Sequence, residues 1–208
     1  MQADTELLPA DESAAVAAGT RRYQRLEEFR PAQRGRSRWV ALAWQLVQAT
    51  LFAVSPHPMN GWRRVLLRAF GARIGAGVVI RPSARVHFPW HLTIGDRSWV
   101  GDEVRLYTLG LIRIGSDTVI SQRSHLCAGT HDHLAPSFST LLPPIAIGDQ
   151  VWIGAEVFVA PGVTIGDGAV VGARSAVFKN LDGGMVHRGS PARPVEPRVM
   201  RPDGTARS

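Results

Sequence analysis

Cysteine is almost absent from this 208-residue chain. The single cysteine, Cys127, has no partner for a disulfide within the chain, which excludes a secreted fold held together by internal disulfides. The N-terminal stretch MQADTELLPADESAAVAAG has neither a basic start nor an unbroken apolar segment, so it lacks the features of a secretory signal peptide. Together these absences lead us to expect a cytoplasmic protein.

The sequence also lacks a nucleic-acid-binding motif and an apolar run long enough to cross a membrane. Its formal charge of +7 comes largely from Arg-rich ends, and aromatic residues are not interleaved with the basic ones, so we expect no nucleic-acid partner. The apolar stretch Trp39–Val54 is shorter than the roughly 20 residues of a membrane-spanning helix. The positive charge remains compatible with phosphorylated ligands or an anionic membrane surface.

What the sequence does contain is a six-residue repeat. An aliphatic residue recurs every six positions, and glycine follows it at most of them: Ile147, Ile153, Val159, Ile165, Val171 and Val177, with Gly148, Gly154, Gly166 and Gly172. A period of six fits neither an α-helix nor one long strand. It is typical of a solenoid of short strands, in which the aliphatic residues fill the axis and Gly or Asp makes the corners. With three strands per coil, the sequence predicts an all-β fold, a triangular parallel β-helix.

The repeat reaches back to Ile74 and is interrupted once. Its register breaks after Leu126 and resumes at Ile147, which gives about five coils with one inserted loop. We therefore expect four regions: a disordered tail over residues 1–37, an apolar helical cap over 38–71, a β-helix domain over 72–194 with its loop at 129–146, and a flexible tail over 195–208.

The cap over residues 38–71 has two interpretations. Pro56 and Pro58 end a first helix near Val54. In the second helix the apolar residues recur at helical spacing and the basic ones take the other side: Trp62, Val65, Leu66, Ala69 and Phe70 against Arg63, Arg64 and Arg68. The apolar face either closes the open end of the solenoid, which we favour, or makes a peripheral membrane contact through residues 39–70. Both can hold together.

The inserted loop is where we expect the catalytic residue, because a long loop inside a regular repeat is usually functional or disordered. It carries His131 in the motif Gly-Thr-His-Asp-His. A neutral imidazole, with an ordinary pKa of about 6.5, suits a general base that takes a proton from a hydroxyl. An alternative is a zinc site made by His125, His131 and His133. These three lie within nine residues on one coil and its loop, which disfavours it.

Other polar residues have simpler structural interpretations. Cys127 follows the inward Leu126 and is expected to be a small packing residue. Three aspartates follow an Ile-Gly pair and are expected to accept backbone N–H bonds at corners: Asp96, Asp149 and Asp167. The histidines of the cap and first coil are expected to be structural: His57, His87 and His91.

Several longer segments carry a family resemblance. After the loop with His131 come PPIAIGDQVWIG, PGVTIGD, VGARSAVFK and GSPARP, within about Ile74–Pro194. These segments closely resemble the hexapeptide acyltransferases of the galactoside, maltose and nodulation acetyltransferase group. Before the repeat, SPHPMNGWRRVLLRAFGARIG is similar to the subgroup of colanic acid biosynthesis acetyltransferases.

The resemblance implies a left-handed parallel β-helix that assembles as a homotrimer, with acetyl-CoA bound along the coils between neighbouring subunits and no metal. His131 takes the family's base position, so the acceptor hydroxyl would attack the thioester directly, without an acyl-enzyme. The backbone N–H of Ala155 would face the thioester oxygen, and Trp152 would form a wall on the acceptor side. The implied CoA-binding residues are Gly154, Ala155, Ala173, Lys179 and Arg193, the last two near the adenine and 3′-phosphate.

Two positions depart from the family pattern. Phe178 replaces the usual Thr before Lys179, which removes one polar CoA contact. Gly101 stands where the galactoside enzymes have an Asn that grips the sugar, so that the neighbouring Asp102 becomes an acceptor-side candidate.

We therefore expect an O-acetyltransferase that moves an acetyl group from acetyl-CoA to a sugar hydroxyl during exopolysaccharide or other surface polysaccharide biosynthesis. The saccharide acceptor would be lipid-linked or nucleotide-linked, and the enzyme cytoplasmic or peripheral on the inner face of the plasma membrane. Two alternatives stay open: a non-catalytic β-helix scaffold subunit, and a zinc-dependent γ-type carbonic anhydrase.

Overall fold

The computed structural model of the chain describes residues 34–200. These residues belong to two compact units, His131–Thr140 in one and the rest in the other, and each is described by itself. The expected N-terminal tail falls almost wholly outside the described residues, as does the end of the C-terminal one.

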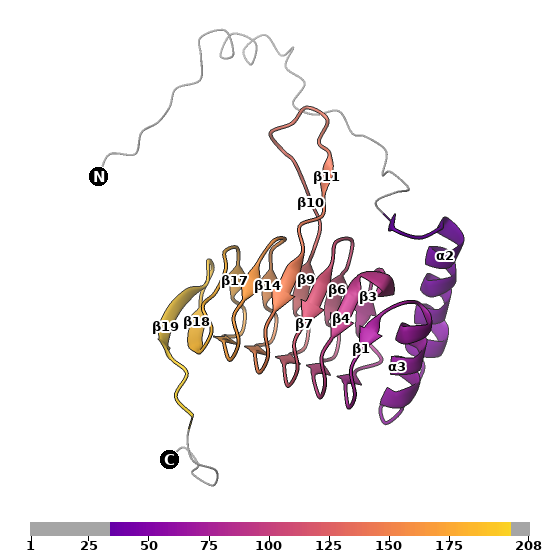
Figure 1. Ribbon diagram of the computed structural model, residues 1–208, viewed down its shortest axis with the longest axis horizontal. Coiled ribbons are helices and arrows are strands. Elements are labelled where there is room, and N and C mark those ends of the chain that lie inside the picture. The colour runs from indigo at the N-terminus through magenta and orange to yellow at the C-terminus, as the bar shows by residue number, and fades with distance from the viewer. Residues whose placement is uncertain (1–33, 201–208) are drawn as a thin grey trace. The chain divides into compact units, whose positions relative to one another are not determined.

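The larger unit is a parallel β-solenoid whose coils each place one short strand in each of three sheets (Figure 1). The first sheet contains β1 (Arg73–Ile74), β4 (Leu92–Ile94), β7 (Ile112–Ile114), β12 (Ile145–Ile147) and β15 (Thr164–Ile165). The second contains β2 (Val79–Ile80), β5 (Trp99–Val100), β8 (Val119–Ile120), β13 (Trp152–Ile153), β16 (Val170–Val171), β18 (Met185–Arg188) and β19 (Arg193–Pro197). The third contains β3 (Arg85–Val86), β6 (Arg105–Tyr107), β9 (His125–Cys127), β14 (Phe158–Val159) and β17 (Ala176–Val177).

The six-residue period sets the core of the solenoid. Within each strand the aliphatic residue of the repeat is buried, and its partner in the next coil is the equivalent residue, as in the pairings of Ile74 with Ile94 and of Ile147 with Ile165. Columns of aliphatic side chains therefore run the length of the axis and form one continuous hydrophobic core. The predicted all-β parallel β-helix is confirmed.

The solenoid is longer than the sequence pattern indicates. Five coils have a strand in all three sheets, as expected, and the chain then makes part of a sixth turn. Leu181 bridges to Ile165, and β18 pairs in parallel with β16. The pattern fails here because His187, which is buried opposite Val171, replaces the aliphatic residue that the repeat would require. Strand β19 then pairs antiparallel with β18 and extends past residue 194, the expected end of the domain.

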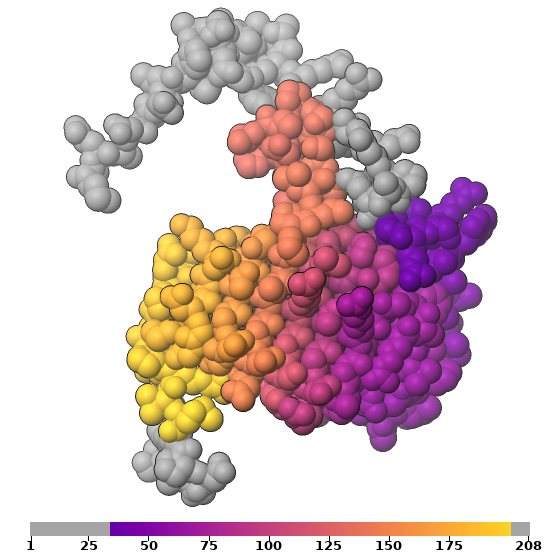
Figure 2. Space-filling view, in the orientation of Figure 1, coloured from indigo at the N-terminus to yellow at the C-terminus, as the bar shows by residue number. Residues whose placement is uncertain are grey.

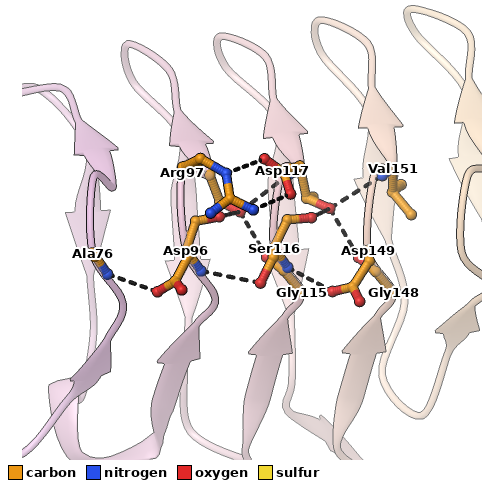
Figure 3. A network of polar contacts seen from close by, with 11 residues as sticks. Ala76, Asp96, Arg97, Gly115, Ser116, Asp117, Gly148, Asp149 and Val151 are labelled. Carbon is orange, nitrogen blue, oxygen red and sulfur yellow. Dashed lines mark hydrogen bonds and ion pairs between the residues drawn. The ribbon is translucent and has the colours of Figure 1, made fainter.

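The corners after the first sheet are held by carboxylates, as predicted (Figure 3). Asp96 accepts a hydrogen bond from the backbone N–H of Ala76 in the preceding coil (2.7 Å), and Asp149 accepts one from Ser116 (2.6 Å). Asp167 does the same for the N–H of Asp149 (2.9 Å). Glycine is required beside them, because a Cβ on Gly148 would collide with the Asp167 carboxylate.

Two helices and the segment between them close the first coil. Helix α2 (Arg38–Val47) continues into a π-helical turn (Gln48–Phe52), and helix α3 (Asn60–Ala69) follows. Trp44, Phe52 and Leu67 are fully buried and belong to the same core cluster as the first coil. No helix within residues 34–200 is long and apolar enough to cross a membrane.

The expected orientation of α3 is wrong, and the correction has a physical cause. In the solenoid, backbone N–H groups of one coil donate to carbonyls of the next, as Gly75 N donates to Ile94 O (2.8 Å). The carbonyls of the first coil therefore receive no bond from a preceding coil and need other donors.

Cap side chains supply those donors. The arginines expected to face away from the core turn toward it: Arg68 donates to Ile74 O, Arg64 to Val78 O and Arg63 to Ile80 O, while the Trp44 indole donates to Val86 O. Arg63 is completely buried, whereas Trp62 and Val65, expected in the core, are exposed.

Candidate functional site

The predicted base, His131, lies in a short hairpin that the structure describes as a unit by itself. Strand β10 (Thr130–His131) and strand β11 (Thr140–Leu141) form a two-stranded sheet. The His131 ring stacks on the Phe138 ring, with centroids 4.4 Å apart and planes 8° from parallel. Its Nδ1 lies 3.0 Å from the carbonyl oxygen of Phe138.

This contact determines which nitrogen of His131 can act as a base. A carbonyl oxygen only accepts hydrogen bonds, so the bond to Phe138 assigns the proton to Nδ1. The lone pair is then on Nε2, on an exposed side chain. An imidazole held in this tautomer is prepared to take a proton from a hydroxyl.

The loop between the two hairpin strands is held by its own hydrogen bonds. The Asp132 carboxylate accepts from the N–H groups of Leu134 (3.1 Å) and Ala135 (3.2 Å), and Asp132 N donates to Ser139 O (2.9 Å). Phe138 N donates to Ala135 O (2.8 Å), which fixes the backbone that carries the carbonyl facing His131. The turn therefore orients His131 through local contacts.

In the larger unit, Trp152 lies on the second sheet and Asp102 lies in the turn that follows β5 of that sheet. Trp152 is the outward residue of β13, about half exposed, and pairs with Val119 of β8, which in turn pairs with Trp99 of β5. The Trp152 indole donates to the Ser121 hydroxyl (3.0 Å). Ser121 also lines a pocket of about 350 Å³ that contains Asp102. The structure thus brings Trp152 and Asp102 to one face.

The pocket is lined by polar and charged residues and by one aromatic residue, Trp99. Its lining consists of Arg81, Trp99, Gly101, Asp102, Glu103, Val119, Ser121, Gln122 and Arg123. The Asp102 carboxylate contacts the Arg81 guanidinium (3.1 Å) and accepts from the Ser83 hydroxyl (2.9 Å). Partial burial alone would raise the pKa of Asp102, but these two partners lower it overall, so the group is a carboxylate at neutral pH. Carboxylate, guanidinium and an exposed indole together suit the hydroxyls and the apolar face of a sugar ring.

The predicted CoA-binding residues fall at two places. Gly154, Ala155 and Ala173 lie together at the corners that follow β13 and β16, where Arg174 N donates to Ala155 O (2.8 Å). A Cβ on Gly154 would lie 2.7 Å from the backbone nitrogen of Ala173, so the two coils approach closely there. Lys179 and Arg193 are both exposed at the C-terminal end of the solenoid. Lys179 comes shortly after β17, and Arg193 is the first residue of β19.

The alternative zinc site finds no support. No three His, Cys, Asp or Glu side chains within residues 34–200 are arranged to hold a metal ion. His125 packs between the rings of Tyr107 and Phe158, and burial, with a smaller effect of Arg105, lowers its pKa. His125 is thus a neutral packing residue.

Sequence reasoning missed three residues of these sites. Arg81 and Ser121 lie one coil before and one coil after Gly101, and the 20-residue spacing of the first coils could have indicated both. Phe138 had no such signal, because its place opposite His131 depends on the turn between them.

Comparisons with known proteins agree with this architecture. Residues 144–179 match the bacterial transferase hexapeptide (six repeats) family. The chain is 56% identical over 156 residues to the colanic acid biosynthesis acetyltransferase WcaF of Escherichia coli, covering 75% of this chain and 86% of that protein. A solved galactoside acetyltransferase in complex with coenzyme A has a TM-score of 0.71 at 24% identity, covering 82% of this chain and 89% of that one. A hexapeptide-repeat acetyltransferase from Vibrio cholerae, solved with acetyl-CoA, has a TM-score of 0.69 at 24% identity, covering 84% and 94%.

The chain therefore belongs to the hexapeptide-repeat acyltransferase family. Within that family it is an acetyltransferase related to the colanic acid biosynthesis enzymes.

Proposed function

We propose that this enzyme is an O-acetyltransferase that moves the acetyl group of acetyl-CoA to a sugar hydroxyl during surface polysaccharide biosynthesis in the cytoplasm. The observation that carries the proposal is the 56% identity to WcaF, a protein named for colanic acid biosynthesis, over most of both chains. The polar and aromatic pocket around Asp102 supports a saccharide acceptor, and the tautomer of His131 supports a base.

In the proposed reaction, Nε2 of His131 takes the proton of the acceptor hydroxyl while the hydroxyl oxygen attacks the thioester carbonyl carbon. The backbone N–H of Ala155 stabilises the negative charge that develops on the carbonyl oxygen. The C–S bond then breaks, the ester remains on the sugar, and the protonated His131 returns its proton to the CoA thiolate. The reaction therefore converts a hydroxyl and a thioester into an ester and a thiol, and it needs neither an acyl-enzyme nor a metal.

The same proposal assigns the remaining residues. Gly154, Ala155 and Ala173 line the path of the pantetheine arm, because small residues leave the corner backbone accessible. Lys179 and Arg193 place positive charge where the phosphates of CoA would lie. The active unit is a homotrimer, with each site completed by a neighbouring subunit.

Acetyl-CoA is expected to raise the melting temperature of the purified, zinc-free protein. At about 100 times its Kd, a ligand that binds only the folded state adds about 2.7 kcal/mol, or about 5–10 °C for a chain of this size. Differential scanning fluorimetry with acetyl-CoA, and with ATP as a phosphate-bearing control, measures it. A folded protein that shows no shift would favour the non-catalytic scaffold.

Replacing Asp102 with Asn is expected to weaken acceptor binding. Asn keeps the size of Asp102 but loses the charge that pairs with Arg81 and that would strengthen hydrogen bonds from sugar hydroxyls. We expect KM for the acceptor to rise about tenfold, with KM for acetyl-CoA unchanged. The matched change Asp117→Asn removes the partner of Arg97 on the first-sheet side of the solenoid and should alter neither constant. Equal losses in both variants would contradict an acceptor role.

A further inference from the structure

The outer face of the helical cap is apolar and exposed. Eight large apolar side chains of the cap are exposed, and this set is here called the cap face: Trp39, Leu42, Leu46, Leu51, Val54, Met59, Trp62 and Val65. Several are more than half exposed, among them Leu46 at 66% and Val54 at 75%. The cap lies at the first-coil end of the solenoid, in the indigo and purple part of Figure 2. Its apolar surface is therefore a feature of one end of this unit.

The cap face lies opposite the packed sides of both helices. In α2, Trp39, Leu42 and Leu46 share one side, whereas Ala41 and Trp44 are buried on the other. In α3, Trp62 and Val65 are exposed, whereas Arg63, Leu66 and Leu67 are buried. The Trp62 indole donates to Leu51 O (3.0 Å), which joins α3 to the π-helical turn. Packing against the solenoid thus uses one side of the cap and leaves the other apolar.

The segment of sequence that carries the cap face contains charges of one sign only. Between Glu28 and Asp96 the chain contains ten arginines and no Asp or Glu. At the start of α2, the exposed Arg38 places its guanidinium 4.8 Å from the centre of the Trp39 ring. An aromatic residue beside a cation is suited to the headgroup level of a bilayer, where the ring contacts apolar chains and the cation contacts phosphate.

We propose that the cap face docks on the surface of an anionic lipid bilayer. The helices would lie in the interface with their apolar side toward the acyl chains and the exposed Arg38 at the headgroups. They do not cross the bilayer, because no helix within residues 34–200 is long enough. A bilayer is the occupant that matches both observations, since it offers apolar depth and negative charge over a broad surface.

Docking in this way places the acceptor pocket near the membrane. The pocket is lined by residues of the first three coils, from Arg81 to Arg123, which follow the cap directly. A saccharide carried on a membrane lipid would then be the substrate class within reach. This consequence rests on the proposed function, whereas the docking itself does not.

The test uses the full-length protein without substrates, so that a failure of acetyl transfer leaves it unaffected. Sedimentation with vesicles of phosphatidylcholine alone is compared with vesicles that also contain phosphatidylglycerol. We expect at least about tenfold stronger partitioning onto the anionic vesicles, reduced by high salt. The double variant Leu42→Gln, Leu46→Gln should lower that partitioning at least about tenfold.

A matched control separates the cap face from general hydrophobicity. The double variant Leu111→Gln, Val199→Gln changes two exposed apolar residues elsewhere on the solenoid unit and should bind vesicles like the wild type. Both variants should keep the wild-type melting temperature. Equal loss in both, or no partitioning by the wild type, would overturn the proposal. A cap variant that changes the oligomeric state in analytical ultracentrifugation but not vesicle binding would instead assign the face to a second copy of the chain.

Discussion

The variant His131→Ala is expected to turn over about 10²–10⁴-fold more slowly than the wild type while acetyl-CoA still binds. The proposed base acts only on the reacting hydroxyl, so its loss affects kcat and leaves the thermal shift by acetyl-CoA intact. The exposed side chain of His131 contributes little to packing, so the melting temperature should also stay close to that of the wild type. Steady-state kinetics with a saccharide acceptor and scanning fluorimetry measure the three quantities.

The same loop offers a matched control. His133 is exposed two residues away, and His133→Ala should leave kcat within about twofold. A third variant, Phe138→Ala, keeps the carbonyl that accepts from Nδ1 but removes the ring on which His131 stacks, so it should lower kcat less than His131→Ala does. If His131→Ala lost acetyl-CoA binding and stability together, the residue would be structural. If it kept full activity, another group would be the base.

The sequence specifies the solenoid well because each coil repeats one physical requirement. An inward aliphatic residue every six positions fills the axis, and Asp or Gly fits the corner, as Asp149 and Gly148 do. The sequence pattern did not predict the partial sixth turn, because the buried His187 takes the inward position of an aliphatic residue there. A periodic pattern therefore predicts the regular part of such a fold and misses the ends, where the environment of each residue changes.

For the candidate site, the sequence could indicate which residues to examine but not how they are held. The break in the repeat led to His131, yet its tautomer depends on the Phe138 carbonyl, which lies seven residues further along the hairpin. Likewise Asp102 was found beside a substituted family position, but its contacts with Ser83 and Arg81, one coil earlier, were not. Both contacts depend on how the backbone brings the two residues together, which the residue types alone do not indicate.

The cap shows the same limit in the arginines of α3. Helical spacing predicted that basic residues face solvent, which holds when a helix packs on a satisfied surface. The first coil is not such a surface, because its carbonyls have no preceding coil to donate to them. Here the need for hydrogen-bond donors outweighs the cost of burying a cation, and Arg63 turns inward.

Replacing Arg63 with Met is consequently expected to destabilise the protein by about 3–5 kcal/mol. The Arg63 guanidinium donates to five acceptors, and a methionine of similar length would leave them without it: Ile80 O (2.6 Å), Ser55 Oγ (2.7 Å), Pro56 O (2.9 Å), His57 O (2.6 Å) and Asn60 Oδ1 (2.9 Å). In this size range such a loss lowers the melting temperature by about 10 °C. Chemical denaturation followed by Trp fluorescence measures the free energy of unfolding.

Arg73→Met is the matched control, because Arg73 is exposed on β1 and its loss should cost less than about 0.5 kcal/mol. Arg63→Lys should recover only part of the stability, since one ammonium group cannot reach acceptors on both the first coil and the segment before α3. Hydrogen exchange separates two causes: faster exchange confined to residues 38–80 means that the cap detaches, whereas uniform acceleration means that the whole solenoid depends on it. If Arg63→Met unfolded like the control, the hydrogen bonds of Arg63 would contribute nothing measurable, and the apolar contacts of the cap with its remaining donors would hold it in place.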